Sequence, residues 1–249
     1  MGSSLDKNHM QKPAAASGPS RWALNSYPTY VSEVDRSINF SGLTHDHFTR
    51  GKAERLISHL KQLNPSVNEI RMLDIGCGQG LIHPYIRERG GLCLTGVDVA
   101  ADALQVARAV NPDVNYKTYD GANLPFLDAS FDVAFTICVM HHVPPQQWSS
   151  FVAEAKRILR PGGVFLIFEH NPWNPLTRLA VSRCPFDYDA VLLSAPRIRR
   201  LMGASGFVHI QQEFIFFTPF SAPAVRRLEL MARWFPFGAQ HVSVGCKPM

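Results

Sequence analysis

The sequence predicts an α/β fold, in which a mostly parallel sheet is wound with helices on both faces. Two observations support this prediction. Short apolar runs alternate with amphipathic helical patterns from about residue 70 to residue 170. Glycines directly follow the first of these runs, in the stretch "LDIGCGQG" at residues 73–80. Strands that alternate with helices of this length form parallel sheets, and the crossover helices cover both faces.

The elements follow in order along the chain. Apolar residues at helical spacing predict a helix from about residue 45, which "NPS" ends at residues 64–66. The helix at residues 144–163 is marked by prolines at its start and glycines just past its end. We expect strands at residues 70–76, 92–99, 114–120, 131–140 and 164–170, and further helices at residues 81–90 and 100–110.

The last third of the chain has a different pattern. Residues 170–193 fit neither a helix nor a strand, and a long irregular stretch after a strand usually builds a site. Residues 194–207 predict a short helix with Ser194 as its cap and Gly206 as its stop. Two strands are expected at residues 207–217 and 241–248, with a basic amphipathic helix, "APAVRRLELMARWF", inserted between them.

These patterns divide the chain into three parts. Residues 1–20 resemble a tag followed by a Pro/Ala/Ser-rich, disordered segment and are left outside the fold. Residues 21–64 form an N-terminal helical cover. Residues 65–249 form the main domain, with substrate-covering insertions at about 170–193 and 218–240.

Composition sets limits on the class of protein. The five cysteines include no C-x-x-C pair, which argues against disulfides and a zinc cluster, so we expect no metal. No apolar run approaches the ~20 residues of a membrane span, and the polar N-terminus predicts a cytoplasmic location. The net charge of +5 arises largely from C-terminal arginines. They predict a solvated basic face, and leave open contact with an anionic substrate, a lipid headgroup or RNA.

The glycine stretch predicts an adenosine-type ligand. Gly76, Gly78 and Gly80 allow a ligand to approach the backbone closely. Asp98 ends the next strand, where an acid binds ribose hydroxyls in nucleoside-binding α/β folds. The spacing G-x-G-x-G lacks the third glycine of the dinucleotide fingerprint, and no Walker G-K-S/T follows. Asp74 precedes the loop, and its carboxylate suits a cationic ammonium or sulfonium better than a pyrophosphate.

Several motifs together resemble the class I S-adenosylmethionine-dependent methyltransferases of small-molecule type. "LDIGCGQG" is similar to their motif I, "GVDVA" to their second motif, and "RILRPGGVFLIFEHN" to their fifth-strand motif. The stretch "YDGANLPFLDASFDVAFTICVMHHV" resembles the part through their fourth strand. The resemblance implies a seven-stranded sheet whose last strand runs antiparallel, which agrees with the strands expected above.

The resemblance also implies which residues bind S-adenosylmethionine and its product S-adenosylhomocysteine. Asp74 and the loop would hold the methionine part, Asp98 the ribose, and Asp120 the adenine amino group. Val99 would lie beside the adenine. The full set of cofactor-binding residues is Asp74, Gly76, Cys77, Gly78, Gly80, Asp98, Val99, Asp120, Gly121, Ala122, Ile137 and Cys138. The alternative for Asp120 is a turn or cap residue.

Catalytic candidates follow the fourth and fifth strands. Methyl transfer is an in-line displacement in which alignment supplies much of the rate, and a base helps where the nucleophile must lose a proton. His141, His142 and Glu169 lie at the predicted strand ends, and imidazole titrates near neutrality. One histidine of the pair is expected to pack or cap instead. In "THDHF", Asp46 is expected to cap the helix and to leave His45 and His47 exposed, with a metal site as the weaker alternative.

The expected function is methyl transfer to an O, N or C atom of a small, hydrophobic metabolite. Trp173, Arg178 and Tyr188 are expected to contact this substrate, and arginines beside aromatics suit a prenyl- or polyketide-like acceptor with an anionic tail. The alternative is a non-catalytic, regulatory protein that binds S-adenosylmethionine. A nicotinamide enzyme is a weaker alternative, because the third glycine of the dinucleotide fingerprint is absent. An RNA methyltransferase is weaker as well, because no N-P-P-Y motif or basic RNA-binding domain is present. A homodimer and contact of the basic helix with a membrane surface stay open.

Overall fold

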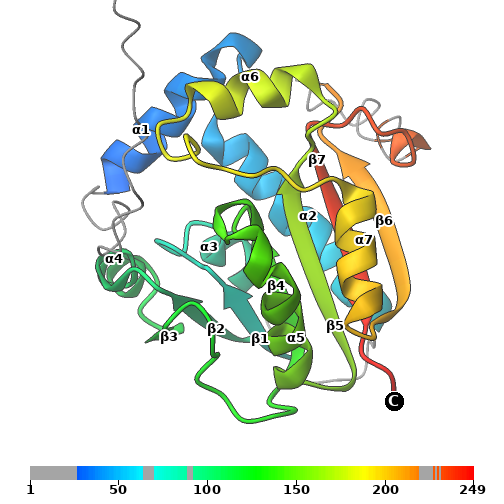
Figure 1. Cartoon of the computed structure of the whole chain (residues 1–249). Coiled ribbons are helices and arrows are strands. Elements are labelled where there is room, and N and C mark those ends of the chain that lie inside the picture. Colours follow the sequence, from blue (N-terminus) through cyan, green and yellow to red (C-terminus); the bar gives the residue numbers. More distant parts are fainter. Residues whose placement is uncertain (1–26, 64–69, 89–91, 219–226, 228, 230) are drawn as a thin grey trace, which may run out of the picture.

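A single twisted sheet organises the molecule. The computed structural model describes residues 27–63, 70–88, 92–218, 227, 229 and 231–249. Within them, seven strands pair in the order β3-β2-β1-β4-β5-β7-β6 (Figure 1). The strands are β1 (Ile70–Ile75), β2 (Leu92–Asp98), β3 (Asn115–Thr118), β4 (Phe131–Ile137), β5 (Leu159–His170), β6 (Val208–Ile215) and β7 (Gln240–Cys246). The pairs among β1 to β5 are parallel, and β7 runs antiparallel to both β5 and β6. The predicted seven-stranded, mostly parallel sheet is confirmed.

Helices cover both faces of this sheet, as predicted. They are α1 (Tyr27–Ile38), α2 (His45–Leu63), α3 (His83–Arg87), α4 (Ala101–Val110), α5 (Trp148–Ile158), α6 (Pro175–Arg183) and α7 (Ala195–Ala204), with the 3-10 turns η2 (Asn39–Ser41), η3 (Met140–His142) and η4 (Pro145–Gln147). Successive residues of a strand point to opposite faces. Accordingly, Leu73 belongs to the apolar cluster with α5 and α7. Its neighbour Met72 belongs to the cluster with α2, α3 and α4.

Two helix ends differ from the sequence prediction in a way that the hydrogen bonds explain. The helix expected at residues 144–163 ends at Ile158, and β5 begins at once with Leu159. Leu159 pairs with Phe131 of β4, and a register shift follows this pair. The residues from Leu159 to Gly162, which the pattern assigned to the end of the helix, therefore belong to strand β5. At α7, the backbone oxygen of Ser194 accepts from the nitrogens of Arg197 and Ile198, and its side chain makes no capping hydrogen bond.

Residues 170–193, expected to be irregular, contain helix α6. Asn174 caps it by accepting from the Thr177 nitrogen over 3.0 Å, and Pro175 occupies its first position. A capping Asn followed by Pro is a local signal for the start of a helix, and it explains why this stretch is helical. In Figure 1, α6 and α1 lie above the carboxyl edge of the strands, and the chain returns from α6 to α7 across that edge.

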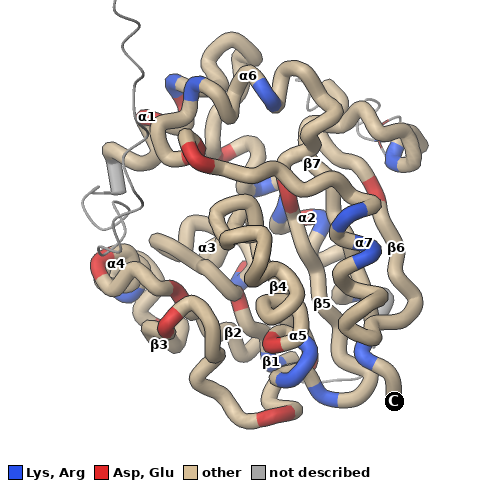
Figure 2. Tube along the Cα trace, in the orientation of Figure 1, with Lys and Arg blue, Asp and Glu red and all other residues tan. Residues whose placement is uncertain are grey.

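The C-terminal insertion is described only in part. Half of the expected helix "APAVRRLELMARWF" falls outside the described residues. Of the other half, Arg227, Glu229, Met231 and Ala232 are helical, and a turn follows at Arg233 and Trp234. On α7, Arg197, Arg199 and Arg200 are exposed, and Figure 2 shows them as blue segments along this helix. These three arginines therefore form the solvated basic face that the charge distribution predicted.

A partly buried ionic contact fixes α2 to the edge of the sheet. Both carboxylate oxygens of Glu213 on β6 accept from the Arg55 guanidinium on α2, and His59 lies 2.9 Å from the same carboxylate. These bonds lower the pKa of Glu213 to about 2 against the opposing effect of burial. The N-terminal cover is thus anchored to a strand more than 150 residues away in sequence.

No described helix combines the length and the apolarity needed to cross a lipid bilayer.

Candidate functional site

A pocket of about 420 Å³ opens at the carboxyl ends of β1, β2 and β4. Its floor comes from the glycine loop after β1 and the residues that follow β2 and β4. Its roof comes from α1 and α2. The lining residues are Tyr30, His45, Thr49, Lys52, Asp74, Gly76, Cys77, Gly78, Gln79, Leu81, Ile82, Asp98, Val99, Ala100, Ala103, Tyr119, Gly121, Ile137, Cys138, Val139, His142, Val143, Pro144 and Gln147.

The glycine loop supplies a bare backbone to this pocket. Gly76 and Gly78 have φ values of 78° and 51°, a region that favours glycine. A Cβ on Gly76 would lie 2.5 Å from the Val139 side chain, so the loop and the residues after β4 can meet only without it. A Cβ on Gly78 would meet nothing within 4 Å, which leaves its backbone open towards the pocket.

Asp98, at the end of β2, both shapes the loop and faces the pocket. Its Oδ2 accepts from the Gly78 nitrogen over 2.7 Å, and its Oδ1 accepts from the Ala100 nitrogen over 2.8 Å. Burial raises the pKa of Asp98, and the two backbone hydrogen bonds oppose that rise. Each oxygen keeps a second lone pair, so the carboxylate can also accept from hydroxyl groups of a ligand.

One carboxylate oxygen of Asp74 is buried and has no hydrogen-bond partner among the described residues. Its Oδ2 lies 2.9 Å from His83 Nε2, and His83 Nδ1 lies 2.6 Å from the Tyr116 hydroxyl. Its Oδ1 makes no hydrogen bond. Burial raises the pKa of Asp74, against the effect of His83. A buried acceptor that makes no hydrogen bond lowers the stability of the fold, and a ligand that donates to it removes this cost.

Asp120 takes the alternative role, that of a turn residue. Its Oδ1 accepts from the nitrogens of Ala122 and Asn123, and its Oδ2 accepts from the Asn123 side chain. These hydrogen bonds lower its pKa to about 2. Gly121 lines the pocket, whereas Asp120, Ala122 and Gly80 do not. Contact of Asp120 with an adenine stays a prediction.

The residues after β4 hold unusual backbone geometry at the pocket wall. Cys138 has a φ of 55°, rare for a residue with a side chain, and its nitrogen donates to the Phe168 oxygen over 2.8 Å. Such strain gathers at functional sites because the surroundings must hold it in place. Ile137 and Cys138 both line the pocket, as the resemblance implied.

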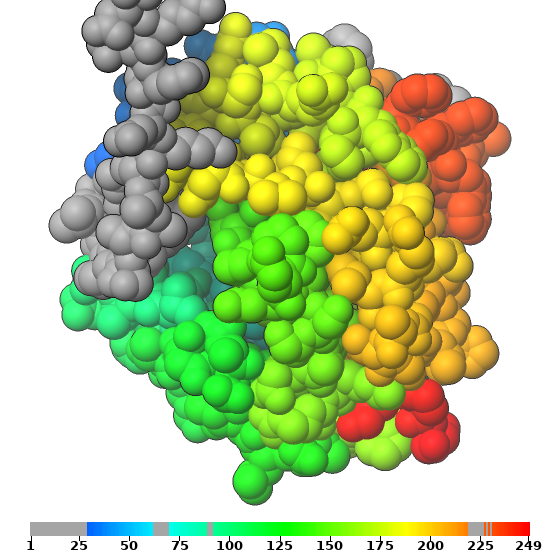
Figure 3. Space-filling model, viewed as in Figure 1, coloured from blue at the N-terminus to red at the C-terminus, as the bar shows by residue number. Residues whose placement is uncertain are grey.

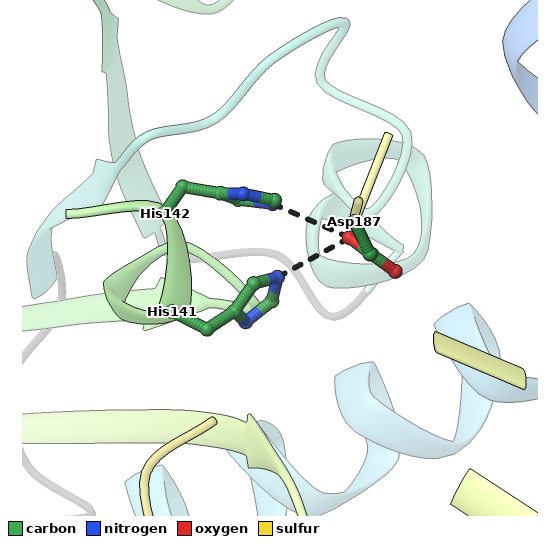
Figure 4. A group of neighbouring side chains, drawn as sticks. All are labelled: His141, His142 and Asp187. Atoms are coloured by element: carbon green, nitrogen blue, oxygen red, sulfur yellow. Dashed lines mark ion pairs between the residues drawn. The ribbon is translucent and has the colours of Figure 1, made fainter. Parts of the chain in front are cut away.

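Two histidines, Glu169 and Asp187 form a cluster beside the pocket. His141 Nδ1 lies 2.6 Å from Glu169 Oε2, while Glu169 Oε1 accepts from the Met140 nitrogen over 2.8 Å. The Nε2 atoms of His141 and His142 each lie 3.4 Å from Asp187 Oδ1 (Figure 4). Asp187 comes from the segment between α6 and α7, which also bonds to η3 through the Val191 nitrogen and the His141 oxygen. In Figure 3 this yellow segment lies over the green atoms of the β4–α5 connection.

The charges in this cluster are divided between its members. Burial opposes protonation of His141, but Glu169 and Asp187 outweigh it and hold its pKa well above the ordinary value. Burial and the nearby His141 lower the pKa of His142 to about 4. Burial would raise the pKa of Asp187, but His141 and the other histidines lower it to about 2. A cationic His141 therefore lies between two carboxylates, and a neutral His142 faces the pocket.

This arrangement separates the three catalytic candidates. Only His142 lines the pocket; His141 and Glu169 are 1% and 0% exposed and do not. Direct proton transfer from a pocket ligand therefore favours His142. Glu169 is placed to hold the η3 turn in position through Met140 and His141.

We expect a marked loss of stability between pH 6.5 and pH 4. Burial lowers the pKa of His45, His142 and His170 to about 4 in the folded state. The unfolded chain binds protons at these groups near pH 6.5, so it gains protons first and folding weakens as pH falls. Each pKa unit is worth about 1.4 kcal/mol. The midpoint of urea unfolding between pH 7 and pH 4.5 measures the effect.

Variants identify the source of that pH dependence. His142→Gln is expected to have a shallower slope, whereas His209→Asn, at an exposed position on β6, should keep the slope of the parent protein. An unfolding midpoint that does not change between pH 7 and pH 4.5 contradicts the assignment.

His141, His142 and Asp187 could also hold a metal ion. One ligand atom from each of the three lies within 4.8 Å of the others. The weaker sequence alternative, a metal at His45 and His47, gathers no such group among the described residues. The predicted cap by Asp46 is wrong: its carboxylate binds Arg50 and Tyr85, and the Thr44 hydroxyl accepts from the His47 nitrogen. Both histidines are half-buried rather than exposed.

The three predicted substrate residues lie on the outer surface of the cover. Trp173 and Tyr188 are 50% and 71% exposed, Arg178 is also exposed, and none lines the pocket. α6 turns Thr177 inward, so its neighbour Arg178 points outward. Phe186 instead packs its ring on Tyr30, which does line the pocket. Trp173, Arg178 and Tyr188 therefore lie outside this pocket, and their contact with a substrate stays a prediction.

Sequence reasoning missed the roof of the pocket. Tyr30, His45, Thr49 and Lys52 come from helices that precede the glycine motif. The sequence pattern singled out only His45 among them, and as an exposed residue rather than a pocket residue. His83 and Asp187 were missed as well. The sequence offers one indication that His83 contacts Asp74, namely its position nine residues after Asp74.

Comparisons with known proteins agree with this geometry. A family model described as a methyltransferase domain matches residues 73–167. The chain is 36% identical over 117 residues to 27-O-demethylrifamycin SV methyltransferase of Amycolatopsis mediterranei (strain S699), covering 44% of this chain and 42% of that protein. It is 31% identical over 112 residues to an uncharacterized methyltransferase of Synechocystis sp., covering 43% of this chain and 52% of that protein. The chain spans about half the length, or less, of these curated relatives.

Solved structures share the fold. A Thermotoga maritima protein described as an S-adenosylmethionine-dependent methyltransferase, possible histamine N-methyltransferase, superimposes with a TM-score of 0.63 at 21% identity, covering 87% of this chain and 94% of that chain. Phosphoethanolamine N-methyltransferase 2 of Haemonchus contortus, in complex with S-adenosylmethionine, has a TM-score of 0.57 at 22% identity, covering 79% of this chain and 53% of that chain.

The sheet with its glycine loop at the carboxyl edge defines a Rossmann-like α/β protein. The strand order and the reversed β7 are those of the class I methyltransferase fold, and residues 73–167 match a methyltransferase domain.

Proposed function

We propose that this chain is an enzyme that transfers a methyl group from S-adenosylmethionine to an O, N or C atom of a small, hydrophobic metabolite. The observation that carries the proposal is one pocket that joins three groups. These are the open glycine loop, the acids Asp74 and Asp98 on adjacent strands, and the neutral His142 after β4. The match to small-molecule relatives such as the rifamycin enzyme supports this acceptor class.

The residues present fit the cofactor. The buried, unpartnered Oδ1 of Asp74 suits the ammonium group of the methionine part. The open face of Gly78 allows close backbone contact, and Asp98 has lone pairs left for the ribose hydroxyls. Val99 and Gly121 line the wall where the adenine would lie, and Ile137 and Cys138 line the opposite wall.

When bound, S-adenosylmethionine supplies an activated methyl group on a sulfonium centre. The chain's part is then to align the acceptor and to exclude water, and alignment supplies ~7–11 kcal/mol of such a barrier. His142 can accept the proton that an acceptor hydroxyl or amine loses. Asp187, 3.4 Å away, stabilises the imidazolium that results. Glu169 and His141 hold the turn that presents His142.

Two binding measurements test the proposal. In calorimetry, S-adenosylhomocysteine is expected to bind with a dissociation constant in the micromolar range or tighter, and NADH is expected not to bind. Absence of S-adenosylhomocysteine binding contradicts the proposal.

A transfer assay separates catalysis from a regulatory role. Protein incubated with S-adenosyl-[methyl-³H]methionine should label a member of a panel of prenyl- and polyketide-like hydroxy and amino compounds, and should not label tRNA. Cofactor binding without labelling of any acceptor supports the regulatory alternative. Labelling of tRNA alone supports an RNA substrate.

A further inference from the structure

Lys52 places a buried cation in the roof of the pocket. It lies on α2, is 8% exposed and lines the pocket. None of the hydrogen bonds or ion pairs found among the described residues involves its ammonium group. The other cation of this helix that lies near the sheet, Arg55, is paired with Glu213. Lys52 therefore differs from its neighbour in having no anionic partner in the part of the chain that the structure describes.

The groups around Lys52 are neutral. His45 lies on its own helix, Cys138 follows β4, and His170 ends β5. Burial, with Lys52 as a further contribution, lowers the pKa of His45 and of His170 to about 4. Burial raises the pKa of the Cys138 thiol although Lys52 opposes this. At neutral pH, none of these three supplies the negative charge that a buried ammonium group needs.

Neither acid that lines the pocket forms an ion pair with Lys52 in the described part of the chain: Asp74 contacts His83 through its Oδ2, and Asp98 accepts from Gly78 and Ala100. Asp187, beside the pocket, lies between His141 and His142. Buried charges in proteins are paired or bind ligands, because an unpaired buried charge weakens folding. No described residue supplies the partner of Lys52, and a molecule bound in the pocket can supply it.

We propose that Lys52 is an anion-binding residue that pairs with a carboxylate, or a similar oxyanion, of a bound small molecule. The proposal rests on the proposed function. The anion that pairs with Lys52 can be the α-carboxylate of S-adenosylmethionine or an acidic group of the methyl acceptor. Either source gives one ion pair with a side chain that is 8% exposed, and an ion pair is stronger where solvent screens it less.

The test compares Lys52→Met with the parent protein by calorimetry. Methionine keeps the length of the side chain and removes the charge. For a cofactor carboxylate, the variant should bind S-adenosylmethionine at least tenfold more weakly, and should bind decarboxylated S-adenosylmethionine as the parent protein does. The second ligand keeps the ammonium and the sulfonium and lacks only the carboxylate.

A second arm detects an acceptor anion. The protein saturated with S-adenosylhomocysteine is titrated with benzoate, acetate and inorganic phosphate, and with neutral benzamide. For an acceptor anion, the parent protein should bind at least one of the anions and not benzamide, and Lys52→Met should lose that binding.

Controls exclude a general effect on folding. Lys61→Met, at an exposed position on the same helix, should change neither the affinity for S-adenosylmethionine nor the binding of the anions. Without ligand, Lys52→Met should unfold at the same temperature as the parent protein or higher, because a buried unpaired charge has been removed. A lower unfolding temperature with unchanged ligand affinities would indicate a structural role and overturn the proposal.

The outcomes separate this proposal from the proposed function. If the parent protein binds S-adenosylmethionine and Lys52→Met changes neither arm, the anion site is wrong and the methyltransferase proposal stands. If the parent protein binds neither form of the cofactor, the proposed function itself fails, and the anion site fails with it.

Discussion

Asp98→Ala is expected to weaken S-adenosylhomocysteine binding by at least ~100-fold, which corresponds to about 2.7 kcal/mol. The substitution removes the proposed acceptor for the ribose hydroxyls. It also removes the acceptor of the Gly78 and Ala100 nitrogens, so the glycine loop loses the contact that fixes its shape. A hydrogen bond to a charged group is worth ~1.5–3 kcal/mol, and a buried donor left without a partner costs a similar amount.

Calorimetry with matched variants measures this loss. Asp98→Asn keeps one acceptor oxygen and should retain an intermediate affinity. Asp102→Ala, four residues further on and exposed in the first turn of α4, should bind as the parent protein does. If Asp98→Ala binds S-adenosylhomocysteine within threefold of the parent value, the ribose site does not lie at the end of β2.

Glu169→Gln is expected to reduce the free energy of unfolding by about 3 kcal/mol, because removing one member of a buried ion pair costs ~3–5 kcal/mol. The amide can still accept from the Met140 nitrogen, but it can no longer balance the charge on His141. The pKa of His141 should therefore fall. In the parent protein its raised pKa adds stability that is complete below about pH 6.5 and is lost as pH rises through the folded pKa.

Urea unfolding at pH 7 and an NMR titration of His141 give the two readouts. Glu88→Gln, an exposed position at the end of α3, is the control and should stay within about 0.5 kcal/mol of the parent protein. Once an acceptor is known, turnover of Glu169→Gln should also fall, since the η3 turn that presents His142 is no longer held. If Glu169→Gln leaves both the free energy of unfolding and the pKa of His141 unchanged, Glu169 does not position the η3 turn.

The floor of the pocket was predictable from sequence because its residues follow strands directly. A glycine turn with Asp74 before it, and Asp98 at the next strand end, lie together in any parallel sheet wound this way. The period of the apolar runs predicted the strands, and their alternation with helices predicted the sheet. For the same reason, nine of the twelve residues carried over from the resemblance line the pocket: Asp74, Gly76, Cys77, Gly78, Asp98, Val99, Gly121, Ile137 and Cys138.

The roof was not predictable, because long-range packing places it. Arg55, one turn further along α2 than Lys52, is bound by Glu213 of β6, and this contact orients α2 so that Lys52 lines the pocket. No local sequence pattern predicts that contact. Asp187 reaches the histidines because the segment after α6 crosses the strand ends. Aromatic content at residues 173–188 suggested a substrate wall, but the helical turn of α6 directs Arg178 outward.

The separate origins of floor and roof have an evolutionary consequence. The stretch shared with the methyltransferase-domain family, residues 73–167, contains the floor and His142, whereas Tyr30, Lys52 and Asp187 lie outside it. On the proposed function, mutation can remodel these flanking segments while the sheet residues proposed to bind the methyl donor stay intact.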